Sequence, residues 1–128
     1  MGTEEAKKVI HKELSYKIVG ALYEVYNRLG FGYQEKIYQR AVEEELFRLG
    51  VPFKRESFSR VNYKGKVVGF YFQDFLIEDK IVLEMKVGDN LYQRNINQVL
   101  SYLKDSGKKL GIVAVFTRHG VIIRRVLN

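Results

Sequence analysis

A chain of 128 residues has room for one domain, since independent domains commonly run to about 100–150 residues. Hydrophobic residues make up 46% of the chain, which is enough for a core, and the absence of cysteine excludes disulfides, thiolate metal ligands and a cysteine nucleophile. A formal charge of +7, from 22 Lys and Arg against 15 Asp and Glu, favours a polyanionic partner but is also typical of a well-solvated surface. We therefore expect a single domain over residues 1–128.

The N-terminal residues 1–8 are charged rather than apolar. No run along the chain approaches the roughly 18 uninterrupted apolar residues that a membrane helix needs. We expect a soluble, cytoplasmic protein without a membrane partner. Because cysteine is absent, any metal ion must be bound by oxygen or histidine ligands.

Two helices are predicted in the first part of the chain. Apolar residues recur at helical spacing over residues 4–29, and glycines at positions 30 and 32 end that pattern. A second helix is predicted from about residue 34 to 49, and it ends at Gly50, shortly before Pro52. The residues that this second helix is expected to bury are Ile37, Ala41, Val42 and Leu46.

The period of the pattern changes to two after Pro52, which is typical of strands. Three strands are predicted as a meander, over residues 53–63, 66–77 and 81–87. A helix over residues 91–106 and two strands over residues 110–116 and 121–126 follow. This order indicates an α+β fold with a mixed sheet flanked by helices, and the glycine loop of a Rossmann fold is missing.

Two carboxylates are expected to face each other on the second and third strands. If residues 78–80 form a three-residue loop, Ile77 pairs with Ile81 and Asp74 falls opposite Glu84. A two-residue turn would instead send Asp74 to the other face of the sheet. The apolar neighbours that make unpaired charges costly here are Phe70, Phe72, Phe75, Leu76, Val82 and Leu83.

Opposed like charges destabilise a strand pair unless a cation neutralises them. A divalent metal ion between Asp74 and Glu84 is one solution. An inert charge cluster neutralised by Lys86, two residues beyond Glu84 on the same face, is the other, and the spacing alone leaves both open.

Polar residues on two of the predicted helices also favour a functional site. Asn95, Gln98 and Tyr102 form a stripe at helical spacing, suited to phosphate contacts, although a half-solvated helix face would show the same pattern. Glu35 and Tyr38 lie one turn apart near the start of the second helix, where the helix dipole alone also favours a carboxylate. The two histidines, at positions 11 and 119, are expected on the surface.

These residues together resemble a known family. The segment Gly32-Tyr33-Gln34-Glu35-Lys36-Ile37-Tyr38 resembles the G-x-x-E-x-x-Y signature of the GxxExxY proteins, a prokaryotic family in the PD-(D/E)XK nuclease superfamily. Asp74, Glu84-Met85-Lys86 and Gln98-Val99-Leu100-Ser101-Tyr102 match its D…E-x-K core and Q-x-x-x-Y helix, in that order. Gln73 stands where the superfamily name has proline.

The resemblance implies a restriction-endonuclease-like αβββαβ core. It also implies that Asp74 and Glu84 bind Mg²⁺ or Mn²⁺ and that Glu35 completes the acidic cluster. Lys86 would orient the attacking water or help to deprotonate it. Such an ion prefers oxygen ligands and keeps open positions for a phosphate oxygen and a water.

The same resemblance implies that Gln98, Tyr102 and Tyr38 contact the substrate. The function expected first is that of an Mg²⁺-dependent nuclease that hydrolyses phosphodiester bonds in DNA or RNA, with DNA favoured. The alternative is a nuclease-fold module for nucleic-acid binding or assembly, with little or no catalysis. Because the domain is minimal, a protein partner or a homodimer formed across a sheet edge is also expected.

Overall fold

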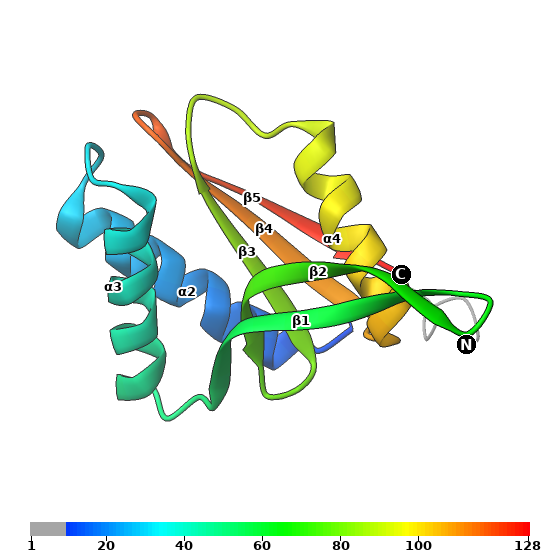
Figure 1. Ribbon diagram of the computed structural model, residues 1–128. Helices are drawn as coiled ribbons and strands as arrows, with labels where there is room; N and C mark the ends of the chain where they lie inside the picture. The colour runs from blue at the N-terminus through cyan, green and yellow to red at the C-terminus, as the bar shows by residue number, and fades with distance from the viewer. Residues whose placement is uncertain (1–9) are drawn as a thin grey trace, which may run out of the picture.

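A computed structural model describes residues 10–128 of the chain, so the expected helix start at Glu4 lies outside the described part. The elements follow each other in the predicted order (Figure 1). They are α2 (Lys12–Leu29), α3 (Glu35–Arg48), β1 (Phe53–Tyr63), β2 (Lys66–Ile77), β3 (Ile81–Val87), α4 (Gln93–Ser106), β4 (Leu110–Thr117) and β5 (Gly120–Leu127). Within residues 10–128, none of the helices is both long enough and apolar enough to cross a membrane.

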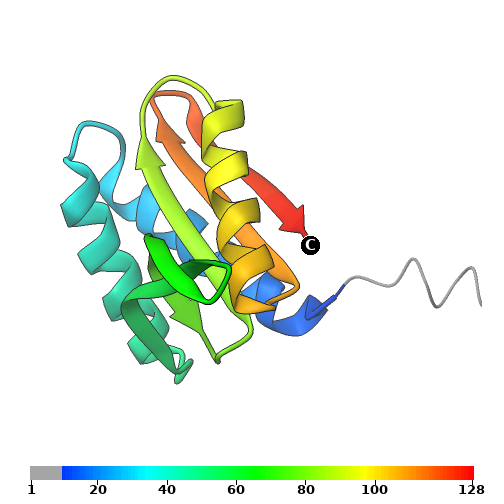
Figure 2. The same cartoon turned by 45° about the vertical axis from the view of Figure 1, so that its right-hand side comes forward.

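The strands form one five-stranded sheet in the order β1-β2-β3-β4-β5. Neighbouring strands are antiparallel except β3 and β4, which are parallel because α4 carries the chain back between them. Helices α2 and α3 cover one face of the sheet and α4 covers the other (Figure 2). The predicted α+β fold with a mixed, helix-flanked sheet is confirmed.

The turn between β2 and β3 has the length on which the carboxylate argument depends. Ile77 pairs with Ile81, and the Lys80 N–H donates to the Ile77 carbonyl at 2.9 Å. Glu78 and Asp79 both adopt left-handed backbone angles, with φ of 50° and 57°, which reverse the chain with the twist that a hairpin needs. The three-residue loop is therefore confirmed, and with it the register that aligns Asp74 with Glu84.

Two apolar clusters fill the space on either side of the sheet. The larger lies between the sheet and α2 and α3, with Ile18, Leu22 and Leu46 packed against the central strands. The smaller lies between the sheet and α4, and Val99 of α4 belongs to it. A Cβ at Gly111 would overlap the side chain of Val99, so the glycine allows α4 to lie close to β4.

Helices α2 and α3 correct two details of the sequence prediction. Helix α2 begins at Lys12, because His11 has a φ of 52° and lies in a turn with Ile10. In α3, Ile37 was expected in the core but is 39% exposed, whereas Tyr38 is fully buried. The apolar stripe of α3 runs through Tyr38, Val42 and Leu46, at spacings of four residues, and it turns Ile37 towards solvent.

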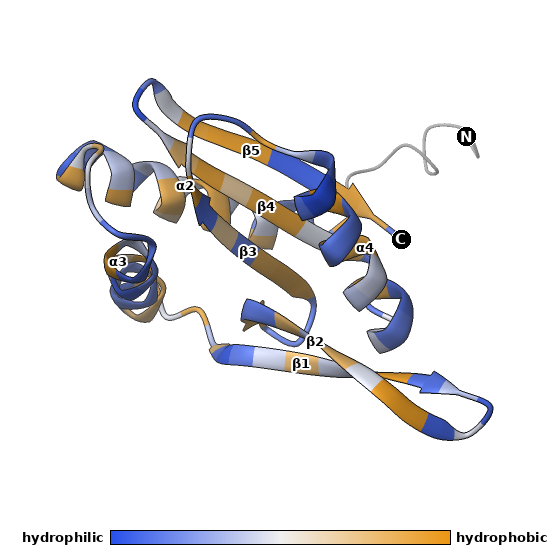
Figure 3. Ribbon diagram, turned by 45° about the horizontal axis from the view of Figure 1, so that its top comes forward, coloured by the Kyte–Doolittle hydropathy of each residue, from blue (hydrophilic) through white to orange (hydrophobic). Residues whose placement is uncertain are grey.

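The outer half of the β1–β2 hairpin extends beyond the rest of the sheet (Figure 3). Phe70 and Phe72 lie there and are exposed, so the expectation that they surround the carboxylates in an apolar environment is wrong. Tyr71 and Leu76 both pack into the α4 cluster, although regular alternation would place residues five apart on opposite faces. The strand face therefore reverses between them.

The reversal coincides with an irregular position in β1. Glu56 has a φ of 52°, and the ladder between β1 and β2 omits the pair of Glu56 with Asp74. A left-handed residue inside a strand bends it and re-aims the side chains beyond. The bend lies beside Asp74, where the hairpin leaves the core.

Candidate active site

Asp74 and Glu84 lie where strands β2 and β3 separate. The ladder between these strands ends at the pair Phe75 and Leu83, one step before the two carboxylates. Beyond it, each side chain bonds to the opposite backbone: Asp74 Oδ2 accepts from the Met85 N–H at 2.7 Å, and Glu84 Oε1 accepts from the Asp74 N–H at 3.3 Å. The carboxylates thus replace the missing ladder bonds. They are held close to each other at the point where β2 and β3 separate, which we call the fork.

Burial makes this pair of charges costly. Glu84 is only 4% exposed and Asp74 is half-buried. Burial and, next, the charge of Asp74 raise the pKa of Glu84 to about 7. Burial likewise raises the pKa of Asp74, even though the Met85 N–H, Lys86 and Arg55 act in the opposite direction. Because the pKa values of both carboxyl groups are raised, binding of a cation beside them would favour their ionised forms.

Lys86 supplies one positive charge to the pair. Its Nζ lies 3.1 Å from Glu84 Oε2, in an ion pair that is largely buried on the glutamate side. Burial acts to lower the pKa of Lys86, but Glu84, Glu35 and Asp74 together outweigh it, so the pKa is raised. At neutral pH the lysine is therefore a cation that can donate hydrogen bonds.

Glu35, at the first position of α3, lies within electrostatic reach of this cluster. Burial raises the pKa of its carboxyl group; Lys86 lowers it and Asp74 raises it further. The side chain also accepts a hydrogen bond from Gln39 Nε2 at 3.2 Å. Nevertheless, among the described residues no group of three or more His, Cys, Asp or Glu side chains is close enough to hold a metal ion.

Arg55 is a residue of the site that the sequence pattern did not reveal. Its guanidinium group donates to the Asp74 carbonyl at 3.0 Å, to Gln39 Oε1 at 3.1 Å and to Glu43 Oε2 at 3.3 Å. The group also lies 4.4 Å from the ring centroid of Phe75. Arg55 thus ties the backbone of Asp74 to α3, the helix that carries Glu35. The only signal in the sequence was a charged residue inside a predicted strand.

The two tyrosines expected at the substrate lie inside the protein. The Tyr38 side chain is fully buried, its hydroxyl donates to the Gly30 carbonyl, and its ring centroid lies 4.5 Å from that of Phe116. Tyr102 is also buried, with its hydroxyl 2.7 Å from Ser57 Oγ. These contacts make both residues part of the packing that positions α3 and the hairpin.

The polar stripe on α4 is buried more deeply than a half-solvated face would be. Asn95 is buried and its Oδ1 accepts from the Tyr92 N–H at 3.3 Å, as part of the cap of α4. Gln98 is half-buried on the same helix and is the member of the stripe with access to solvent for a substrate contact. Gln98 is thus the remaining candidate for that role.

Gln73, noted in the sequence only because it replaces a proline, has an unusual environment. Its side chain is 2% exposed, and neither its amide oxygen nor its amide nitrogen has a hydrogen-bond partner among residues 10–128. An unpaired buried polar group costs about 1–3 kcal/mol. Gln73 thus places a buried side-chain amide next to Asp74.

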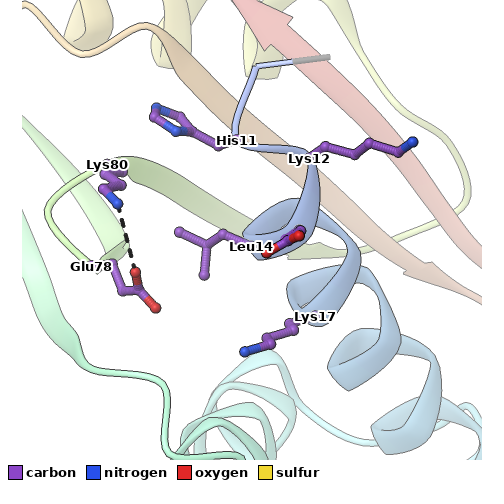
Figure 4. Close-up of a pocket in the computed structure, with 7 residues that line it drawn as sticks. His11, Lys12, Leu14, Lys17, Glu78 and Lys80 are labelled. Carbon is purple, nitrogen blue, oxygen red and sulfur yellow. Dashed lines mark ion pairs between the residues drawn. The ribbon is translucent and has the colours of Figure 1, made fainter. Parts of the chain in front are cut away.

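A surface hollow lies elsewhere, between the start of α2 and the β2–β3 turn (Figure 4). Its lining residues are His11, Lys12, Glu13, Leu14, Lys17, Glu78 and Lys80. Lys80 Nζ lies 3.9 Å from Glu78 Oε1 in this hollow. The hollow contains none of the residues expected at the active site, so it does not mark the carboxylate centre. His119 is exposed, as expected, and His11 is half-buried.

The donor set at the fork fits a divalent cation. Asp74 and Glu84 present hard oxygen atoms, which Mg²⁺ and Mn²⁺ prefer. Burial raises the pKa of both carboxyl groups even though the charge of Lys86 acts to lower it. A cation bound there would remove the repulsion that the two side chains now experience.

In this chain, a mixed sheet carries an acidic pair and a lysine at the point where two strands separate. This combination of fold and site defines a class of protein. A family model described as PD-(D/E)XK nuclease superfamily matches residues 12–126, and the chain belongs to this superfamily. The match extends to the superfamily, and the GxxExxY assignment remains a prediction. A search among curated proteins found no match.

Two solved structures share the fold. The structure described as "Crystal structure of SSO0001" has a TM-score of 0.58 and 14% sequence identity, over 90% of this chain and 77% of that one. An alkaline exonuclease, LHK-Exo from Laribacter hongkongensis, has a TM-score of 0.53 and 11% identity, over 84% of this chain and 67% of that one. At such low identity, the likeness concerns the fold.

Proposed function

We propose that this chain is a divalent-metal-dependent nuclease that hydrolyses phosphodiester bonds in DNA or RNA. The observation that carries the proposal is the buried pair of Asp74 and Glu84, accompanied by Lys86, at the fork of β2 and β3. Membership of the PD-(D/E)XK nuclease superfamily supports this reading. The residue order D, then E-x-K, is the same in the chain and in the superfamily name.

Asp74 and Glu84 would hold the ion, with Glu35 added from α3. When bound, a divalent cation polarises the phosphodiester and lowers the pKa of a water molecule. Lys86, held by Glu84, would donate a hydrogen bond to a phosphate oxygen or to the attacking water and offset the charge that develops on phosphorus. Arg55 would keep the Asp74 backbone in place, and Gln98 would contact the substrate.

A cleavage assay tests the proposal. Single-stranded DNA, double-stranded DNA and RNA are incubated with the protein and Mg²⁺ or Mn²⁺, and with the variants Asp74→Asn and Glu84→Gln. We expect each variant to lose cleavage by about a hundredfold or more. Glu44→Gln is a matched control, because Glu44 is an exposed carboxylate on α3, and it should cleave like the parent.

One outcome would contradict the proposed site. If Asp74→Asn and Glu84→Gln cleave like the parent, the carboxylates at the fork do not perform the reaction. If the loss is accompanied by unfolding, which thermal melting monitored by circular dichroism detects, the loss says nothing about chemistry. The Lys86→Met variant then provides an independent test, since it keeps both carboxylates.

The second candidate is a nuclease-fold module that binds nucleic acid without cutting it. The ion pair between Lys86 and Glu84, together with the lack of a three-carboxylate group among the described residues, favours this reading. Binding to nucleic acid in EDTA, combined with no cleavage of any of the three substrates by the parent, would support it.

A further inference from the structure

Three phenylalanine side chains form a contiguous exposed surface on the outer β1–β2 hairpin. We call Phe58, Phe70 and Phe72 the Phe row. Their ring centroids lie 5.9 Å apart from Phe58 to each of the other two, and 6.3 Å apart between Phe70 and Phe72. Between 48% and 59% of each residue is exposed. An exposed aromatic cluster of this kind marks an interaction surface.

The Phe row does not belong to the core. The opposite face of the hairpin packs on α4, where Ser57 Oγ lies 2.7 Å from the Tyr102 hydroxyl and Tyr71 enters the α4 cluster. The strand reversal beside Glu56 turns the row outwards. The hairpin is thus anchored by one face and presents the row with the other.

The charges around the row indicate the partner. From Ser57 to Phe72 the chain carries three basic residues, Arg60, Lys64 and Lys66, and no acidic one. The Arg60 guanidinium lies 5.7 Å from the Phe58 ring centroid. Aromatic rings interleaved with cations are the combination that holds single-stranded nucleic acid, because bases stack on the rings and phosphates meet the cations. A second copy of the chain would instead bring two positively charged hairpins together.

We propose that the Phe row is a stacking platform for unpaired bases, so that the hairpin selects single-stranded DNA or RNA. The assignment of a substrate class rests on the proposed nuclease function. Phe72 precedes Asp74 by two residues, a separation of about 7 Å along an extended strand. A single strand stacked on the row would then pass within a few residues of Asp74 along β2.

Binding measured without catalysis tests the platform. Fluorescence anisotropy with labelled single-stranded DNA, the same sequence as RNA, and the corresponding DNA duplex is recorded in EDTA. We expect Phe70→Leu/Phe72→Leu to weaken single-strand binding by at least about tenfold, because leucine keeps apolar area but removes the ring. Duplex binding should change by less than about twofold. Phe47→Leu, at an exposed phenylalanine on α3, is the matched control and should bind like the parent.

A spectroscopic readout follows contact at the row itself. The chain contains no tryptophan, so Phe72→Trp introduces a single one. We expect unlabelled single strands, but not the duplex, to quench its fluorescence, while Phe47→Trp on α3 stays unquenched. Quenching in the absence of cleavage would leave the platform standing and count against the nuclease function. Cleavage that depends on Asp74, combined with an unchanged Phe70→Leu/Phe72→Leu variant, would do the opposite.

Three results would overturn the proposal. The first is an unchanged affinity of Phe70→Leu/Phe72→Leu for single strands. The second is an equal loss on the duplex. The third is a dimer of the parent, seen by analytical ultracentrifugation, that Phe70→Leu/Phe72→Leu converts to a monomer, since a second copy would then cover the row. A preference for DNA or for RNA identifies which single strand the platform takes, and a preference for either over the duplex supports it.

Discussion

Strand β2 passes through two environments, and its phenylalanines behave in opposite ways. Phe75 is fully buried against the central sheet, whereas Phe70 and Phe72 face solvent on the outer hairpin. Asp74 lies between the two halves, at the point where the strand leaves β3. Asp74, one of the two carboxylates of the candidate site, thus lies on the boundary between a buried core and an exposed, basic hairpin.

This contrast teaches that a residue pattern does not by itself distinguish a core face from a binding face. Both halves of β2 are rich in aromatic and aliphatic residues and would stabilise a buried strand equally well. The difference arises because the inner half pairs with β3 and is covered by α2 and α3 on one face and by α4 on the other, while α4 covers only one face of the outer half.

The contrast between the two halves is sharpest for truncation of a phenylalanine. Phe75→Ala should lower the free energy of unfolding by about 3–5 kcal/mol, because it leaves a cavity in the core. Phe72→Ala should lower it by less than about 1 kcal/mol, since the ring is already exposed. Urea unfolding curves measure both free energies. Similar values for the two variants would contradict the division of β2 into a buried half and an exposed half.

Removal of a carboxylate should abolish metal binding at the boundary. Asp74→Ala and Glu84→Ala should each weaken Mn²⁺ binding by about a hundredfold or more, equivalent to about 2.8 kcal/mol, and remain folded. Isothermal titration calorimetry measures the affinity, with Glu44→Ala on α3 as the control. Parent-like Mn²⁺ binding by both variants would place the metal elsewhere.

The free energy of unfolding should also depend on pH, because Glu84 is buried beside Asp74. The pKa of Glu84 is raised from 4.5 to about 7 in the folded protein, so the folded state holds this proton more tightly than the unfolded chain. In EDTA, this contribution to stability is fully present below pH 4.5 and falls by on the order of 3 kcal/mol as the pH rises to about 7.

Glu84→Gln cannot titrate, so it should lack that decrease, and the difference between its unfolding free energy and that of the parent isolates Glu84. Glu44→Gln should keep the profile of the parent. Mn²⁺ is expected to restore the stability of the parent at pH 7, because it binds the ionised carboxylates. Parallel profiles for the parent and Glu84→Gln would contradict the raised pKa.

Arg55 connects the two regions, and its loss should have the smallest effect of the four. Arg55→Ala should reduce the free energy of unfolding by about 1–2 kcal/mol, because its bonds to Asp74, Gln39 and Glu43 are partly buried. Arg48→Ala, which removes an exposed ion pair on α3, should cost less than about 0.5 kcal/mol. Mn²⁺ affinity should fall only in Arg55→Ala, and equal effects of the two substitutions would exclude a positioning role.

Local sequence patterns were sufficient to predict the element order, the meander and the register that brings Asp74 to Glu84. These features follow from local chemistry: apolar periodicity, glycine and proline at helix ends, and a three-residue loop. The order of short motifs was enough to indicate the superfamily, which the family match confirms. Periodicity does not specify distant neighbours, however, and this is where the prediction ended.

Which side chains are buried, and which of them meet, depends on contacts between residues far apart in the chain. Ile37, which was expected in the core, is exposed, and Tyr38, which was expected at the substrate, is buried. The reason is that the direction of α3 against the sheet depends on residues far along the chain, including Phe116. Arg55 reaches Asp74 because β1 pairs with β2, and the Phe row is exposed because β2 leaves β3 at Asp74. Burial, and the pKa of Glu84 that follows from it, is a property of the packed molecule that a local pattern does not contain.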